Sequence, residues 1–139
     1  MPSSFALVAG SLESRPELGI AHDPAAGGVV VFAGRVRANN DGRGVVALEY
    51  TAYTALALKQ GRRVLDDARS RFGLLQAHAV HRLGRLLPGE MAIWVRVAAP
   101  HREPAFAACA RIVTEIKQTV PIWKKELYVD GATQWIVCA

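Results

Sequence analysis

Apolar residues recur along this chain at two spacings, which predict an alternation of strands and helices. Between residues 53 and 72 they lie three or four positions apart, as in an amphipathic helix, and Gly73 provides a natural end. The apolar, β-branched run that begins at residue 29 is typical of a buried strand, which is expected to continue to about residue 37. A second helix is predicted at residues 103–119, because Pro121 lacks a backbone donor and cannot continue it.

Turn residues divide the rest of the chain into short strands. The turn signals are Asn39-Asn40-Asp41-Gly42, Pro88-Gly89 and Asp130-Gly131. The remaining predicted strands are residues 5–8, 45–51, 75–83, 91–98, 122–129 and 133–137, and Ser14-Arg15-Pro16-Glu17 predicts the start of a short helix. This order predicts an α+β fold in a single domain over residues 1–139, with helices covering a mainly antiparallel sheet and a small C-terminal β element.

Composition places the chain with ordinary globular proteins, since 51% of its residues are hydrophobic and 21% are charged. No apolar run reaches the length of a membrane span, and the segment Met1-Pro2-Ser3-Ser4 lacks the basic start of a signal peptide, so a cytoplasmic protein without membrane contact is expected. Cys109 and Cys138 follow neither a CxxC pattern nor a zinc-ligand spacing. Neither a metal site nor a disulfide framework is expected.

The formal net charge of +5, with a pI of about 9.7, favours anionic partners. The partner could be a nucleic acid, a phosphorylated small molecule or an acidic protein surface. Alternatively, the basic surface has no specific partner.

Lys117 occupies an unexpected position on the second predicted helix. At about 100° per residue it falls into one arc with Phe106, Ala110 and Val113, whereas polar residues occupy the opposite arc. A lysine on a packed face either extends its ammonium to the rim or sits in a pocket with anions, because burial disfavours the charge. The second alternative would make Lys117 a candidate nucleophile, acid or base.

Lys124 and Lys125 follow Pro121, so they belong to an extended segment and not to the helix. Successive side chains of a strand point to opposite faces, so only one of the two lysines can face a pocket below the helix end. The alternative is that both are ordinary charges on an edge strand.

Other basic residues offer weaker signals. His101 and Arg102 precede the second helix, where unpaired N–H groups attract anions, but a capping role on the surface fits equally well. Arg35 and Arg37 have the spacing of one strand face and form either an anion clamp or a solvated strand end. The two histidines of the strand at residues 75–83, His78 and His81, are three apart and therefore point to opposite faces, so structural roles are predicted for both. Cys109 is expected to be a packed apolar residue.

Five segments in register resemble the MoaE family, the large subunits of molybdopterin synthase. They are Phe32-Ala33-Gly34-Arg35-Val36-Arg37, His81-Arg82-Leu83-Gly84, Pro88-Gly89-Glu90, His101-Arg102, and Lys117 with Pro121-Ile122-Trp123-Lys124-Lys125-Glu126. Each segment is short, but their shared order and spacing over about 100 residues is specific.

The resemblance implies an α/β hammerhead-type fold and a homodimer at the core of a heterotetramer. Each subunit would bind a small ubiquitin-like sulfur-carrier subunit, whose Gly-Gly thiocarboxylate delivers two sulfurs to cyclic pyranopterin monophosphate, without a metal or other cofactor. By position, Lys117 and Lys124 match the family's catalytic lysines. Arg37, His101 and Arg102 match its anion-binding residues, and Phe32 matches a pocket wall.

Two alternatives remain at this point, one from another class of protein and one within the same enzyme class. A basic nucleic-acid-binding module would need aromatic residues interleaved with basic ones, and only 7% of the residues are aromatic. A persulfide sulfurtransferase would use Cys109 as its nucleophile, and alkylation of the thiol would abolish its activity but not that of a lysine mechanism.

Overall fold

The computed structural model describes residues 2–15 and 23–137, which form two helices and nine strands. In chain order the elements are β1 (Ser3–Val8), β2 (Gly28–Arg35), β3 (Asn39–Asn40), β4 (Arg43–Ala52), α1 (Thr54–Phe72), β5 (Gln76–Arg82), β6 (Gly84–Leu86), β7 (Met91–Ala99), α2 (Arg102–Thr119), β8 (Ile122–Tyr128) and β9 (Thr133–Val137).

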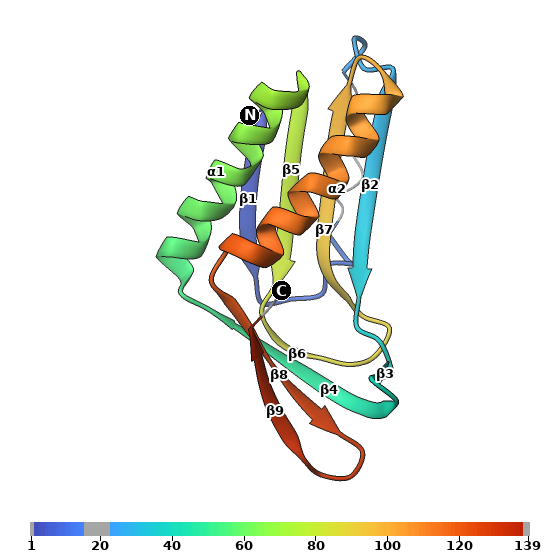
Figure 1. Cartoon of the computed structure of the whole chain (residues 1–139), viewed down its shortest axis with the longest axis vertical. Helices are drawn as coiled ribbons and strands as arrows, with labels where there is room; N and C mark the ends of the chain where they lie inside the picture. The colour runs from blue at the N-terminus through green and yellow to red at the C-terminus, as the bar shows by residue number, and fades with distance from the viewer. Residues whose placement is uncertain (1, 16–22, 138–139) are drawn as a thin grey trace.

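The first sheet has the strand order β1-β5-β7-β2. Strand β1 is parallel to β5, and the other two pairings are antiparallel. Both helices lie across one face of this sheet, with α1 over β1 and β5 and α2 over β7 and β2 (Figure 1). Strand β2 is an edge strand that runs beside α2.

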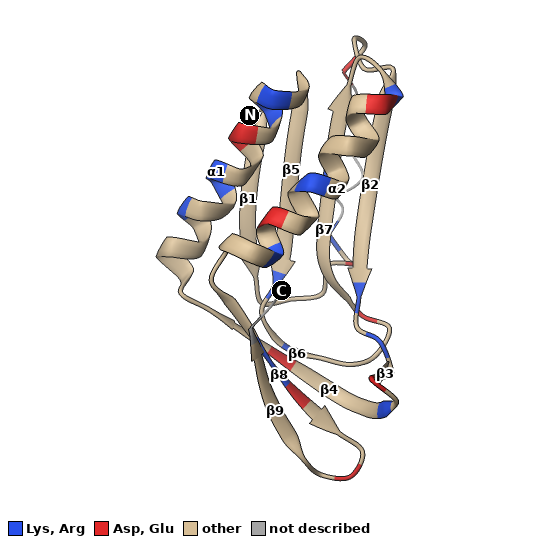
Figure 2. Cartoon of the chain, in the orientation of Figure 1, with Lys and Arg blue, Asp and Glu red and all other residues tan. Residues whose placement is uncertain are grey.

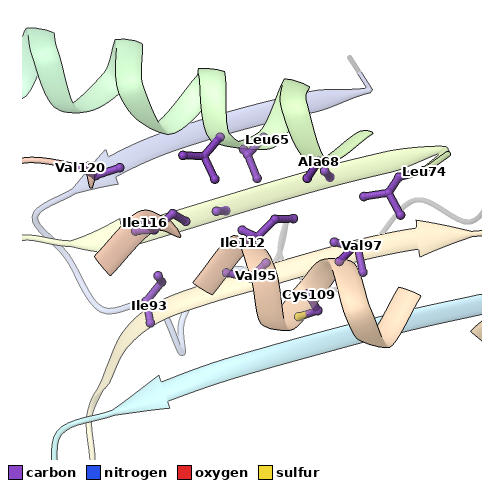
Figure 3. Packing of buried hydrophobic residues seen from close by; sticks show 14 of the residues in the cluster. Leu65, Ala68, Leu74, Ile93, Val95, Val97, Cys109, Ile112, Ile116 and Val120 are labelled. Atoms are coloured by element: carbon purple, nitrogen blue, oxygen red, sulfur yellow. The ribbon is translucent and has the colours of Figure 1, made fainter. Parts of the chain in front are cut away.

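The main core lies between the helices and this sheet. Leu65 and Ala68 of α1 and Ile112 and Ile116 of α2 point toward the sheet, where they meet apolar side chains of β5 and β7 such as Val95 (Figure 3). All five of these side chains are buried. Burying a leucine or isoleucine side chain stabilises the fold by roughly 1.5–3 kcal/mol, so this layer fixes the helices on the sheet.

The second sheet has the order β3-β4-β8-β9, and β6 pairs with β4 outside this path. It extends below the first sheet at the C-terminal end of α2 (Figure 1). Strand β8 follows α2 after a short junction at Val120 and Pro121, where the Tyr53 N–H donates to the Pro121 carbonyl at 3.2 Å. The junction therefore ties the second sheet to the start of α1.

The predicted α+β class, with helices over a mainly antiparallel sheet, is confirmed. Helix α1 ends as expected at Gly73, whose φ of 64° is left-handed. Strands β3 and β6 were not predicted, since two or three residues carry too little periodicity. The expected helix start at Pro16-Glu17 lies outside the described residues.

Basic and acidic positions are interspersed along both helices (Figure 2). Among the described residues, no helix is long and apolar enough to cross a membrane.

Candidate active site

A cavity of about 170 Å³ lies where the two sheets meet, below the C-terminal end of α2. Its inner lining is apolar and buried, with Ile93, Ile116 and Ile122 all at most 4% exposed. Its polar lining includes four basic side chains and one carboxylate. These are Arg35, Arg37, Lys117, Lys124 and Glu126.

Lys117 lines this cavity from the last turn of α2, but the prediction that it lies on the buried face of the helix is wrong, because it is exposed. The buried arc is centred on Ile112 and Ile116, roughly a third of a turn away. Phe106, which shares the lysine's stripe, is 63% exposed. The helix packs on the sheet through a narrower arc than its apolar residues suggested, and its C-terminal end carries Lys117 to the cavity rim.

Lys124 enters the same cavity from β8, opposite Tyr50 of β4 in the strand register. Lys125 points to the other face of the sheet, where its ammonium lies 5.7 Å from the centroid of the Trp135 ring. The expectation that only one of the adjacent lysines faces the pocket below the helix end is thus met, and that lysine is Lys124. The two lysines of the cavity come from different elements, seven residues apart in the chain.

Lys124 is held by a network of hydrogen bonds that sequence reasoning missed. Its Nζ lies 3.2 Å from Glu126 Oε1, and the Glu126 carboxylate also accepts hydrogen bonds from Asn40 Nδ2 at 2.8 Å and from the Tyr128 hydroxyl at 2.6 Å. Burial alone would raise the pKa of Glu126, but the hydrogen bonds from Tyr128, Asn40 and Lys124 lower it overall. Strand alternation alone places residues 124, 126 and 128 on one face, which is the signal that could have revealed this network.

The end of β2 supplies the two arginines and an aromatic wall. Arg35 Nη1 donates to the Gly89 carbonyl at 2.8 Å and lies 3.8 Å from Glu13 Oε2. Arg37 is exposed and has no ion-pair partner among residues 2–15 and 23–137, so its guanidinium is available to an anion. Phe32 lines the cavity, as expected of a pocket wall.

His101 and Arg102 do not reach this cavity. They border a separate surface depression, with Gly27, Pro100 and Glu103, at the opposite end of α2. Arg102 and Lys117 are fifteen residues apart on one helix, which corresponds to about 22 Å along its axis. Both members of the His-Arg pair are exposed. Within one chain, they and the lysines cannot contact the same small ligand.

His81 is a further cavity residue, for which only a structural role was predicted. It is 6% exposed and lies on the face of β5 that is turned toward the helices. Its ring meets that of Tyr50 edge-on, with the centroids 4.8 Å apart.

Cys109 of α2 is buried as part of the main core, as expected of a packed apolar residue. Burial raises the pKa of its thiol, which lowers the fraction of reactive thiolate. These properties argue against a persulfide mechanism at this residue. Cys138 lies outside the described residues, and within them no three His, Cys, Asp or Glu side chains cluster as metal ligands.

The fold therefore places four basic side chains, two of them lysines, around a partly apolar pocket, which is the kind of site that suits anionic reactants. The sequence model of the family described as MoaE protein matches residues 11–119. A Nostoc relative, the "Molybdopterin synthase catalytic subunit", is 40% identical over 134 residues, which cover 96% of this chain and 81% of the relative. The chain belongs to the MoaE protein family.

Solved structures share the fold. Molybdopterin synthase from Staphylococcus aureus superposes with a TM-score of 0.81 at 33% identity, over 96% of this chain and 95% of that chain. A Helicobacter pylori structure, a complex of subunits 1 and 2 of molybdopterin-converting factor, superposes with a TM-score of 0.74 over 96% of this chain and 88% of that chain. At 23% identity, this second likeness concerns the fold alone.

Proposed function

We propose that this chain is the catalytic subunit of a molybdopterin synthase. It transfers sulfur twice, from the C-terminal thiocarboxylate of a small ubiquitin-like subunit to cyclic pyranopterin monophosphate, and so forms the dithiolene of molybdopterin. The observation that carries the proposal is the convergence of Lys117 and Lys124 on one cavity whose other charged lining residues are Arg35, Arg37 and the internally bonded Glu126.

The electrostatics of the cavity suit this reaction. A thiocarboxylate and a cyclic phosphate are both anions, and bringing them together requires fixed positive charge in a site that excludes water. Glu126 does not neutralise the site fully, because its oxygens are already engaged by Asn40, Tyr128 and Lys124. The guanidinium of Arg37, which has no ion-pair partner in the described part of the chain, is suited to a phosphate.

The two lysines are assigned different roles. Lys117, exposed at the cavity rim, contacts the thiocarboxylate carbonyl and is placed to accept the acyl group when sulfur departs. Lys124, fixed by Glu126, acts on the pterin as acid or base. Sulfur arrives on the partner in activated form, so the proposed chemistry requires neither Cys109 nor a metal.

The small subunit is the partner that this function requires. The Helicobacter pylori protein of the same fold is found in complex with the other subunit of its converting factor, and the proposal extends such an assembly to this chain. We place the reaction in the cytoplasm, where a free, buried thiol such as Cys109 is stable.

A homodimer would bring His101 and Arg102 into the same reaction. Edge strand β2 exposes Val29 and Val31, at 47% and 52%, and an apolar edge of this kind favours pairing with a second strand. Strand β2 begins beside Pro100 and Arg102 and ends at Arg35 in the cavity wall. Antiparallel pairing of two β2 strands about a two-fold axis would therefore place His101 and Arg102 of one subunit near the cavity of the other.

The test is a single-turnover reaction with purified chain, thiocarboxylated small subunit and cyclic pterin phosphate. Formation of molybdopterin, together with co-purification of a small protein ending in Gly-Gly, is the expected result. Salt-sensitive retention on DNA without binding of the small subunit would instead support the nucleic-acid alternative and overturn the proposal.

A further inference from the structure

The imidazole of His81 is fixed at the inner end of the cavity. One of its ring nitrogens, Nδ1, lies 2.8 Å from the carbonyl oxygen of Arg82, and the Tyr50 ring holds it edge-on. A backbone carbonyl can only accept a hydrogen bond, so Nδ1 must carry the proton. In the neutral ring, Nε2 is therefore an acceptor with a free lone pair.

Nε2 of His81 has no hydrogen-bond partner among the described residues. It is also not one of the fully buried polar atoms that lack a partner, so it retains some accessible surface. Because the residue lines the cavity, this nitrogen is open to an occupant. A ligand that donates an N–H to this nitrogen would give it a hydrogen-bond partner that the surrounding protein does not supply.

The surroundings keep this imidazole uncharged. Burial, opposed by the Arg82 hydrogen bond and aided by the charge of Lys117, lowers the pKa of His81 to about 4. The other charged side chains that line the cavity are Lys124 and Glu126 from β8, and Arg35 and Arg37 at the end of β2. A neutral acceptor thus lies at the inner end of a cavity whose rim is cationic.

We infer that Nε2 of His81 accepts a hydrogen bond from an N–H group of a bound reactant and so orients that reactant below Lys117. The lone pair repels the oxygens and sulfur of an anion, so the phosphate and thiocarboxylate belong with the lysines and arginines, and a neutral donor belongs with His81. This inference rests on the proposed function. Two reactants carry such a donor, namely the pterin ring and the backbone amides of the Gly-Gly tail.

The experiment on the wild-type protein is NMR of ¹⁵N-labelled histidine, with the His81 signals assigned from a variant spectrum. The free protein should show an unprotonated Nε2. Its resonance should move on saturation with either the cyclic pterin phosphate or a synthetic peptide ending in Gly-Gly, and the ligand that moves it identifies the donor. A protonated Nε2 in the free protein, or no movement with either ligand, would overturn the inference.

Substitutions separate ligand binding from a structural role. His81→Asn places an amide N–H near the position of Nδ1, so it retains the bond to Arg82 but lacks the acceptor, and it should weaken binding of the identified ligand about tenfold. His81→Gln, whose amide oxygen reaches toward the position of Nε2, should recover part of that loss. The matched control is His78→Asn on the opposite face of β5, where the histidine contacts Ser4, and it should leave both affinities unchanged.

The outcomes also distinguish the inference from the function on which it rests. If His81→Asn binds both ligands within twofold of wild type while Lys117→Ala is inactive, the His81 assignment is wrong and the proposed function stands. If the wild-type protein binds neither ligand and forms no molybdopterin, the proposed function itself fails.

Discussion

The Lys124 ammonium lies 3.2 Å from the carboxylate of Glu126, a residue that is only 2% exposed. Asn40 of β3 and Tyr128 of β8 donate further hydrogen bonds to that carboxylate, so the anion that positions Lys124 is itself held by its own strand and by one other element. The reach and direction of this lysine are therefore set by β3 and β8 together.

Replacing Glu126 by Gln should disable Lys124 without removing it. A neutral amide holds an ammonium more weakly and cannot accept all the present hydrogen bonds, so single-turnover formation of molybdopterin should fall at least about tenfold. The melting temperature should also fall. Asp130→Asn is the control. Asp130 lies on the same β8–β9 hairpin as Glu126, but it pairs with Arg43 of β4 at the surface, so this variant should retain activity. Equal activity of Glu126→Gln and wild type would show that the ion pair does not position a catalytic group.

Loss of either cavity lysine should nearly abolish turnover, whereas loss of Lys125 should not. Lys124→Ala should lower the single-turnover rate by about 10²–10⁴-fold, the range expected for a group that transfers protons, and Lys117→Ala, which removes the acyl acceptor, should lower it at least as much. Lys125→Ala should remain within about twofold, since its side chain lies over Trp135 on the other face. Thermal melts of Lys117→Ala should match wild type, because the side chain is exposed. Equal losses at Lys124 and Lys125 would contradict the assignment.

Mixing two inactive variants should restore activity if His101 and Arg102 serve the partner's cavity. In a dimer of one Lys117→Ala and one Arg102→Ala subunit, one cavity would contain both changes and the other neither. Random reassociation should then give about one quarter of wild-type activity. Sedimentation of each variant should first show a dimer. No recovery on mixing would indicate that the two residues do not act across a subunit boundary.

Acidification should destabilise the fold through His81. The unfolded chain takes up this proton near pH 6.5 but the folded chain only near pH 4, so the free energy of unfolding should decrease as the pH falls between these values. The pKa difference corresponds to at most roughly 3 kcal/mol. Urea unfolding from pH 7 to pH 4.5 should show a shallower dependence for His81→Asn than for wild type. His78, whose pKa burial also lowers, is present in both proteins and cancels in the comparison.

Much of the fold could be predicted from local pattern, because both helices and the longer strands carry their own periodicity. The orientation of α2 could not. Its apolar residues spread over a wide arc, and only packing on β7 and β2 selects Ile112 and Ile116 for burial and leaves Phe106 exposed. A lysine at the margin of that arc was consequently assigned to the wrong face.

The site could be predicted where the direction of a side chain depends on a single strand. It could not be predicted where segments distant in the sequence come into contact. Alternation separated Lys124 from Lys125 correctly. By contrast, Glu126 and Asn40 are 86 residues apart in sequence, and His81 enters the cavity from a different sheet from Lys124. No local spacing reports such contacts. The roles assigned to Lys117, Lys124, Arg37, Phe32, His101 and Arg102 stay predictions.

The short junction at Val120 and Pro121 has a consequence for protein engineering. It carries the chain from a helix packed on one sheet directly into a strand of the other, so the spacing between Lys117 and Lys124 depends on the angle at which the two sheets meet. A peptide of residues 117–126 grafted onto another scaffold would keep the sequence but lose that angle. The lysine pair is therefore transferable only together with both sheets.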